Sequence, residues 1–260
     1  MIAVACQRWR SGAASYRPAG ETIATRLYEV AEIAKDGPAR AFVEAHHYSR
    51  SYPAARRRYG LYRAGSLVGV AVFSVPCRSE VLRPLPESAE AAELGRFVLL
   101  DDVPANGETW ALARCFELLR RDGFEGVVSF SDPWPRATLD GRRVFGGHVG
   151  TIYQAHNAVY LGQARTDTAR LLPDGRSLHN RAVAKIRGLD KGWRAAAQAL
   201  VDAGAPPIEG DPRTWVELVL PRLVRTFRRP GNHKYVWGLT RAVRRGLPTS
   251  KRYPKMGGLS

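Results

Sequence analysis

Apolar residues recur along this chain at spacings that predict strands and helices in alternation. Thr25–Ile33 alternates between apolar and polar positions, as a half-buried strand does. Pro38 opens a helical pattern that runs to Ser49, since proline is favoured in the first turn of a helix. Arg58–Arg63 and Leu67–Val75 flank a short glycine-bearing turn and predict a β-hairpin.

The pattern continues with a strand, a helix and two further strands. Glu93–Leu100 predicts a central strand, and strands are also expected at Gly126–Phe130 and Ala158–Gln163, with a short helix carrying Tyr153 between them. Glu108–Arg121 predicts an amphipathic helix. Its apolar stripe consists of Leu112, Cys115, Phe116 and Leu119.

The pattern changes after Arg165. Three helices separated by Gly/Pro-rich breaks are predicted at Ser177–Arg187, Lys191–Ala203 and Pro212–Phe227, followed by a last strand at Lys234–Leu239. The first 20 residues lack periodicity and are expected to form a frayed or loosely attached arm.

The order of the predicted elements resembles the acetyltransferase fold of the GNAT class. We therefore expect an α/β fold whose mixed central sheet is flanked by helices, with a basic helical insertion toward the C-terminus. The expected organisation is a flexible N-terminal arm at 1–22, a GNAT-like core at 23–164, a basic helical insertion at 165–232, and a final strand with a basic tail at 233–260.

The formal net charge of +16 is concentrated toward the C-terminus. Residues 165–260 hold 20 Lys and Arg against 7 Asp and Glu. Such a field attracts nucleic acid through phosphate neutralisation and counterion release. A solvated basic surface without a partner is the alternative, and the regional bias favours nucleic acid.

Cysteine usage and hydropathy indicate a cytoplasmic protein with no membrane association. Cys6, Cys77 and Cys115 are odd in number and widely spaced, which excludes a full disulfide framework and fits a reducing compartment. The apolar runs are too short to cross a bilayer, and the N-terminus lacks the apolar region of a signal peptide.

In GNAT proteins the helix after the central strand receives the pyrophosphate of coenzyme A at its N-terminus, where backbone N–H groups and the helix dipole attract anions. Here Asn106 and Gly107 stand at that position as candidate cofactor-binding residues. Asp101, Asp102 and Glu108 would repel a diphosphate, so an ordinary capped helix is an equal alternative.

Three polar residues are candidates for catalysis near the strand at Gly126–Phe130. Two of them directly follow this strand, and the third lies on the short helix after it. Ser131 and Asp132 stand where this strand ends, and the Asp132 carboxylate can serve as a base or can simply terminate the strand in an Asp-Pro turn. Tyr153 stands where GNAT enzymes often place a proton-donating tyrosine, and a half-buried structural tyrosine is the alternative.

His47 and Tyr48 end the helix that begins at Pro38. Adjacent histidines point in different directions on a helix, so at most one of His46 and His47 is expected to face a site. The run Arg56, Arg57 and Arg58 lies among tyrosines and can hold backbone phosphates, or it can be a solvated face.

Taken together, the ordered motifs resemble the Mom family of phage DNA-modification proteins. The matching pieces span roughly residues 40–240 and are HHYSR at 46–50, LVGVAVFSVP at 67–76, ELGRFVL at 93–99, VVSFSDP at 127–133, GGHVGTIYQAHN at 146–157, LHNRAVAKIR at 178–187 and HKYVWGL at 233–239.

The resemblance implies a phage or prophage transferase that attaches a carbamoylmethyl group to N6 of adenine in double-stranded DNA and so protects it from host restriction. The implied site residues are His47, Tyr48, Arg96, Ser131, Asp132 and Tyr153, of which Arg96 is expected to contact the cofactor. Acetyl-CoA or another donor of a two-carbon unit is the expected cofactor. His47, Tyr48 and Asp132 together offer ligand types that iron accepts.

The target base must leave the stack to reach such a site. Tyr48 or Trp134 can stack on it. The basic region supplies phosphate contacts, for which Arg181, Lys185 and Arg187 are the candidates.

Two other functions stay open at this stage. One is an N-acetyltransferase acting on a small amine, a modified base or tRNA, and the other is a non-catalytic DNA-binding protein on the same scaffold. A homodimer is compatible with the sequence, which leaves the oligomeric state, the group donor and the target context open.

Overall fold

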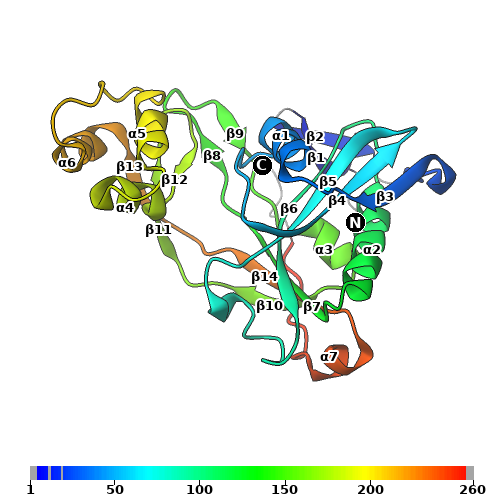
Figure 1. Ribbon diagram of the computed structural model, residues 1–260. Coiled ribbons are helices and arrows are strands. Elements are labelled where there is room, and N and C mark those ends of the chain that lie inside the picture. The colour runs from blue at the N-terminus through cyan, green and yellow to red at the C-terminus, as the bar shows by residue number, and fades with distance from the viewer. Residues whose placement is uncertain (1–4, 11–12, 19, 256–260) are drawn as a thin grey trace. The chain divides into compact units, whose positions relative to one another are not determined.

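A computed structural model describes residues 5–10, 13–18 and 20–255, which fold into two compact units (Figure 1). The first unit comprises Met1–Pro133, His148–Ala164 and Asn232–Ser260, and the second comprises Trp134–Gly147 and Arg165–Gly231. No helix in the described ranges combines the length and the apolar character needed to cross a bilayer.

A seven-stranded mixed sheet forms the centre of the first unit, in the order β10-β14-β7-β6-β5-β4-β3. Its strands are β3 (Tyr28–Glu32), β4 (Ala55–Arg63), β5 (Ser66–Ser74), β6 (Ala91–Leu99), β7 (Gly126–Ser131), β10 (Val159–Gln163) and β14 (His233–Gly238). The helices of this unit are α1 (Asp36–His46), α2 (Gly107–Arg121), α3 (Thr151–Ala155) and α7 (Arg241–Gly246), with short 3-10 turns at Thr25–Leu27 and Ser79–Val81. The expected arrangement of a mixed central sheet flanked by helices is confirmed.

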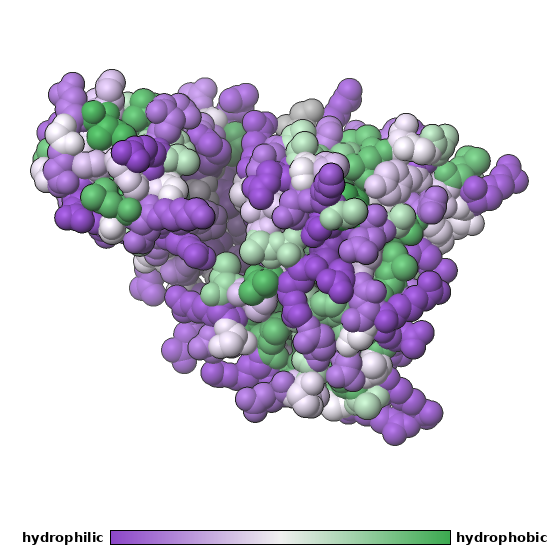
Figure 2. Space-filling model, in the orientation of Figure 1, coloured by the Kyte–Doolittle hydropathy of each residue, from purple (hydrophilic) through white to green (hydrophobic). Residues whose placement is uncertain are grey.

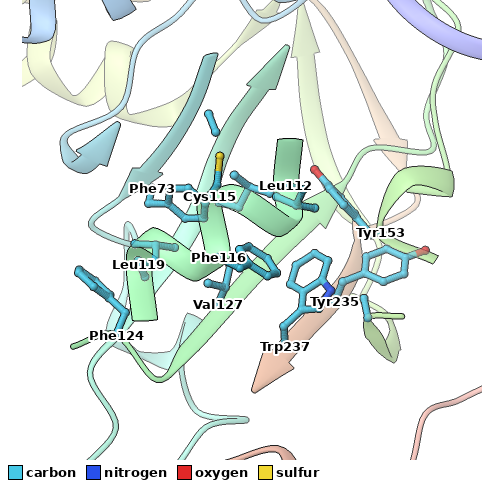
Figure 3. Close-up of a cluster of buried hydrophobic side chains, with 14 of the residues drawn as sticks. Phe73, Leu112, Cys115, Phe116, Leu119, Phe124, Val127, Tyr153, Tyr235 and Trp237 are labelled. Atoms are coloured by element: carbon cyan, nitrogen blue, oxygen red, sulfur yellow. The ribbon is translucent and has the colours of Figure 1, made fainter. Parts of the chain in front are cut away.

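The helices cover both faces of this sheet because successive strand residues point to opposite sides. On one face α1 packs Ala39 and Val43 against Val70 and Val72 of β5. On the other face the predicted stripe of α2 is buried together with Phe73 of β5. Figure 3 shows this second cluster, in which Phe116, Tyr153, Tyr235 and Trp237 bring aromatic rings from α2, α3 and β14 together.

A β-bulge in β6 opens the sheet at its centre. Val72 pairs with Arg96 while Phe73 pairs with Leu94, so Gly95 is an extra residue in β6. A Cβ atom on Gly95 would lie 2.5 Å from Ser74 Oγ, so a larger residue at this position would force Ser74 to move. The parallel pairing of β6 with β7 ends at Leu94 and Ser129. Beyond that point the two strands no longer pair, and the residues that follow them are the predicted site residues.

The N-terminal segment is not the irregular arm that the sequence predicted. Residues Ala5–Arg10 (β1) and Ala13–Pro18 (β2) pair as an antiparallel hairpin. Arg8 is buried, forms an ion pair with Glu108 of α2, and donates to the carbonyl groups of Pro104 and Ala105. The prediction was wrong here because two strands can pair without a clear apolar period in the sequence, and Arg8 ties β1 to α2.

The second unit is a mixed α/β body. Its helices are α4 (Asn180–Gly188), α5 (Trp193–Val201) and α6 (Pro212–Leu223), and its strands are β8 (Arg136–Ala137), β9 (Arg143–Phe145), β11 (Asp167–Leu171), β12 (Ser177–Leu178) and β13 (Arg225–Arg229). The helices share a core that contains Ile186, Leu200, Trp215 and Val216.

Two predictions for this unit were wrong. Residues 225–227, expected at the end of the helix from Pro212, belong to β13, and Ser177 and Leu178, expected at the start of the first helix, form β12. Both segments pair with β11, so tertiary pairing overrides local helical periodicity.

Candidate functional site

Predicted site residues from four segments of the first unit meet where β6 and β7 part. Ser131 ends β7 and Asp132 follows it, and both side chains are buried. Arg96 lies on β6 just past the bulge, while His47 follows α1. The bulge and the early end of pairing leave β6 and β7 unpaired beside these residues.

His47 is the residue that ends α1, and its ring is buried. Its backbone N–H makes the last helical bond, to the Val43 carbonyl, and its extended backbone (ψ 139°) then takes the chain out of the helix. The Ser49 N–H donates to His47 Nδ1 at 3.1 Å, and Ser49 Oγ lies 2.9 Å from the same atom. Burial, reinforced by the charge of Arg96, lowers the pKa of His47 well below its ordinary value. The imidazole is therefore neutral at neutral pH.

The neighbouring residues confirm that only one histidine of the pair faces inward. His46 packs its ring against Phe42, with ring centroids 4.7 Å apart. Tyr48 lies against His47 at 4.2 Å, and its ring meets His148 edge-on at 5.9 Å. Tyr48 thus joins the end of α1 to the glycine-rich segment before α3.

Arg96 holds the segment after α1 against β6. Its Nε donates to the Ser51 carbonyl at 2.8 Å and its Nη2 to Ser51 Oγ at 2.7 Å. Its Nη1 donates to the Gly95 carbonyl at 2.5 Å. Burial lowers the pKa of Arg96, and the nearby Tyr48 and Glu93 partly offset this effect. These bonds point to a positioning role, whereas the predicted contact with a cofactor stays a prediction.

Ser131 and Asp132 form the opposite side of the opening. The Asp132 carbonyl accepts the backbone N–H of His148 at 2.8 Å, so the end of β7 and the segment before α3 are tied together. Among the described residues, the Ser131 hydroxyl makes no hydrogen bond of normal geometry, although it lies close enough to the Tyr235 phenol to influence that group's pKa.

Tyr153 lies on α3 with only 8% of its surface exposed. Its ring meets Tyr235 and Trp237 edge-on, with centroid distances of 5.4 Å in both cases, and its hydroxyl points away from Trp237 (Figure 3). Burial raises the pKa of Tyr153, although a hydrogen bond with Ser129 opposes this effect. Tyr153 is therefore a protonated phenol beside the opening, the state that a proton donor needs.

The structure adds residues that the sequence analysis did not single out. Ser49 and Ser51 contact His47 and Arg96, and His148 contacts Tyr48 and Asp132. Glu93 of β6 is close to Arg96 and Lys234, and burial raises its pKa. All of these residues lie inside or directly beside the quoted motifs, but their roles depend on contacts between distant segments, which the spacing of residues in the sequence does not reveal.

The start of α2 is occupied by the chain itself. The Ala105 N–H donates to a Glu21 carboxylate oxygen at 3.1 Å, and the Gly107 N–H donates to the Pro104 carbonyl at 2.9 Å. Asn106 Oδ1 accepts the backbone N–H of Ile23 at 2.6 Å. Two backbone donors at this helix end are taken and a carboxylate already lies against them, which disfavours a diphosphate there.

The iron expectation finds no support in the described residues. They contain no group of three or more His, Cys, Asp or Glu side chains placed to hold a metal ion. In the proposed set of His47, Tyr48 and Asp132, the Nδ1 atom of His47 is already engaged by Ser49.

The three arginines predicted to contact phosphates on β4 each have an acidic partner. Arg56 pairs with Glu90, Arg57 with Asp122 and Arg58 with Asp36. These ion pairs reduce the positive field that the run presents to DNA.

In the second unit, Trp134 packs against Phe227 with centroids 4.4 Å apart, and Arg187 forms a two-pronged ion pair with Glu217. Arg181 is exposed and Lys185 is partly exposed. Hydrophilic residues predominate on the face shown in Figure 2.

A cavity of about 440 Å³ also lies in the first unit, lined among others by Phe116, His156, Trp237 and Arg244. None of the predicted site residues lines it, so it is distinct from the opening between β6 and β7.

The solved structures to which this chain is similar include two GNAT proteins. A tandem GNAT protein from the clavulanic acid biosynthesis pathway, solved without AcCoA, is 8% identical, covers 82% of this chain and 99% of its own, and gives a TM-score of 0.45. A GNAT family acetyltransferase from Elizabethkingia anophelis with acetyl-CoA bound is 10% identical, with coverages of 82% and 98% and a TM-score of 0.31. No curated protein matches the chain.

The family comparison covers most of the sequence. The profile of the Mom protein family matches residues 27–255, a span that contains α1, the whole central sheet, α2, α3 and the second unit. The chain therefore belongs to the Mom protein family.

Proposed function

We propose that this protein modifies DNA by attaching a carbamoylmethyl group to N6 of adenine, which protects the DNA from restriction endonucleases. The observation that supports this most is the family match over residues 27–255, and the candidate catalytic residues His47, Asp132 and Tyr153 are all buried in the first unit. DNA is the expected partner because the family acts on DNA and the chain carries a net charge of +16.

The chemistry requires removal of a proton from a weak nucleophile. The lone pair of adenine N6 is delocalised into the ring, so the amine must be oriented and must lose a proton as the bond to carbon forms. In the proposal Asp132 accepts this proton. The carboxylate is buried at the end of β7, where the tie between its carbonyl and His148 holds the loop in place.

The second half of the reaction is departure of the leaving group. As the bond from N6 to the methylene carbon forms, the bond from that carbon to the leaving group breaks, and the proposal assigns Tyr153 to protonate the departing atom. Its raised pKa keeps the phenol protonated at neutral pH. The donor must carry its leaving group on the methylene carbon, since plain acyl transfer gives an amide instead.

Adenine N6 is inaccessible inside a duplex, so the base is expected to flip out of the stack. The cost of unstacking is a few kcal/mol and is offset by phosphate contacts from basic residues. Arg181 and Lys185 of α4 are the candidates with exposed cationic side chains in the second unit.

The test is mass analysis of nucleosides from DNA of bacteria that express the chain. We expect a deoxyadenosine heavier by one carbamoylmethyl group, and its loss with Asp132→Asn. A deoxyadenosine carrying an acetyl group would support an N-acetyltransferase instead. Only unmodified deoxyadenosine, with folded protein that binds DNA, would leave a binding protein as the function.

A further inference from the structure

A chain of hydrogen bonds leads from Arg96 to the imidazole of His47. Arg96 Nη2 donates to Ser51 Oγ at 2.7 Å, and Ser51 Oγ donates to Ser49 Oγ at 3.4 Å. Ser49 Oγ lies 2.9 Å from His47 Nδ1. The four residues come from β6 and from the segment after α1, so the chain connects the opened strand to the end of the helix.

The direction in which these hydrogen bonds donate is fixed at both ends of the series. A guanidinium has donors only, so Ser51 Oγ must accept from Arg96 and has its own proton left for Ser49. At the other end, the backbone N–H of Ser49 points at His47 Nδ1 at 3.1 Å. A backbone N–H can only donate, so Nδ1 must offer its lone pair. Each hydrogen in the chain therefore points toward Nδ1.

The state of the imidazole follows from these contacts. In a neutral ring whose Nδ1 is an acceptor, the single proton sits on Nε2. An imidazolium would place two N–H groups against each other and a second cation close to the buried Arg96. Nε2 is also the ring nitrogen that makes no hydrogen bond to the described residues.

We infer that His47 acts as a neutral hydrogen-bond donor, presenting Nε2–H to an acceptor atom of the substrate, and that Ser49, Ser51 and Arg96 are the positioning residues that hold it in this state. The inference rests on the proposed function for the identity of the substrate. The acceptor is a ring nitrogen of adenine or the carbonyl oxygen of the transferred group, both of which are hydrogen-bond acceptors. A donor fixed in advance stabilises charge that develops on such an atom.

The first experiment is independent of activity. In full-length protein labelled with nitrogen-15 at histidine, the His47 signals, assigned by their loss in His47→Gln, are expected to show a proton on Nε2 and an acceptor lone pair on Nδ1 at neutral and mildly acidic pH. A proton on Nδ1, or an imidazolium at neutral pH, would overturn the inference even if the protein modifies DNA. The expected spectrum would stand even if the modified base proved to be a different one.

The second experiment separates a donor from a base or a metal ligand. A glutamine amide can present an N–H close to the position of Nε2, whereas alanine presents nothing and glutamate is an acceptor at neutral pH. We expect His47→Gln to lower modification by about tenfold, and His47→Ala and His47→Glu by about 10²- to 10³-fold, the usual effect of removing one such donor. Equal loss in all three variants would contradict a donor role. His46→Gln is the matched control and is expected to modify DNA normally, because His46 packs against Phe42.

The positioning residues have a test of their own. Ser49→Ala removes the Oγ contact and leaves the backbone N–H, so a loss of several-fold in modification is expected, accompanied by a changed nitrogen-15 shift at His47 Nδ1. Ser49→Thr retains the hydroxyl and should restore both. A loss of activity in Ser49→Ala with an unchanged Nδ1 shift would show that Ser49 acts in some other way.

Discussion

At the scale of single residues, Tyr153 combines a role in the core with a role in the site. Its ring is part of the aromatic cluster, and its phenol lies next to Ser129. Ser129 also donates to the Leu94 carbonyl at 3.0 Å, so removal of the phenol does not leave Ser129 without a partner. The two roles can therefore be separated by deleting one oxygen atom.

We predict that Tyr153→Phe lowers DNA modification by about 10²-fold or more, as expected for loss of a proton donor. The free energy of unfolding should change by only about 1 kcal/mol, the net value of one hydrogen bond. Nucleoside mass analysis and urea denaturation measure the two effects. Tyr59→Phe is the control, since Tyr59 lies in the same cluster but its hydroxyl donates to Asp122 at 3.1 Å. Similar activity in both variants would remove Tyr153 from the mechanism.

His233 makes the folding stability of the protein depend on pH, and the burial of its ring gives the sign of that dependence. Its ring is buried, its Nδ1 lies 2.7 Å from the Tyr160 hydroxyl, and burial lowers its pKa in the folded state. The unfolded chain therefore takes up a proton at His233 at a higher pH than the folded chain does. Stability is full above the ordinary histidine pKa of about 6.5 and falls as the pH drops from there toward the folded-state value.

The corresponding measurement is the urea midpoint as a function of pH. We expect the midpoint to fall on acidification through the range below about 6.5, and His233→Asn to reduce that dependence. His46→Asn should leave the dependence as it is in the native protein, since His46 is only partly buried. A native protein whose midpoint rises on acidification through this range would contradict the assignment.

At the scale of elements, the bulge in β6 determines where the site forms. It turns Arg96 to the face of the sheet that α1 covers, where Ser51 accepts its hydrogen bonds. Leu94, two residues earlier, stays in the cluster with α2. The sequence motif around Glu93–Leu99 indicates a central strand, but a bulge has no reliable periodic signal and was not predicted.

Gly95→Ala tests this element. The new Cβ would lie 2.5 Å from Ser74 Oγ and 3.2 Å from Pro53 Cγ. We expect a loss of about 1–3 kcal/mol in stability, as for other overpacked sites, together with reduced modification. Gly37→Ala is the matched control, because nothing lies within 4 Å of its Cβ position. Combining Gly95→Ala with Ser74→Ala should recover part of the stability, and failure to do so would place the strain elsewhere.

Some helices and strands could be predicted from the sequence because their signals lie in nearby residues, whereas others could not. The apolar stripe of α2 and the β4–β5 hairpin follow from periodicity and turn chemistry, which depend on nearby residues. The β1–β2 hairpin and β13 were missed because their stability comes from distant partners, Arg8 with Glu108 and Arg225–Arg229 with β11. The site residues could be selected from motifs, but the contacts among them could not.

At the scale of the whole molecule, charge is the property most closely connected to a nucleic-acid partner. The net charge is +16, yet several arginines that the sequence offered as DNA contacts form ion pairs within the chain. Counting basic residues therefore overstates the field that DNA meets. The basic residues without such partners matter more for binding.

The effect of such an ion pair on DNA binding can be measured at Arg187 and its partner Glu217. We predict that Glu217→Gln strengthens DNA binding, because it frees a guanidinium that is now held at 2.6 Å by a carboxylate. Arg181→Ala should weaken binding and reduce the slope of log affinity against log salt by about 1, as expected for the loss of one phosphate contact. Fluorescence anisotropy over a range of salt concentrations measures both. An unchanged slope in Arg181→Ala would exclude a phosphate contact at that residue.

The order of strands in the central sheet has a consequence for how the chain is made. β14 lies between β7 and β10, but it is the last of the seven strands in the sequence. During synthesis, one edge of β7 therefore stays unpaired until β14 has emerged from the ribosome up to Gly238. Most residues of β7 are buried in the folded protein, so this edge exposes apolar side chains in the nascent chain. Open edges of this kind invite pairing with other chains, and contacts between distant segments form slowly. We expect nascent chains that stop before His233 to depend on chaperones, and the central sheet to be completed only after β14 has emerged from the ribosome.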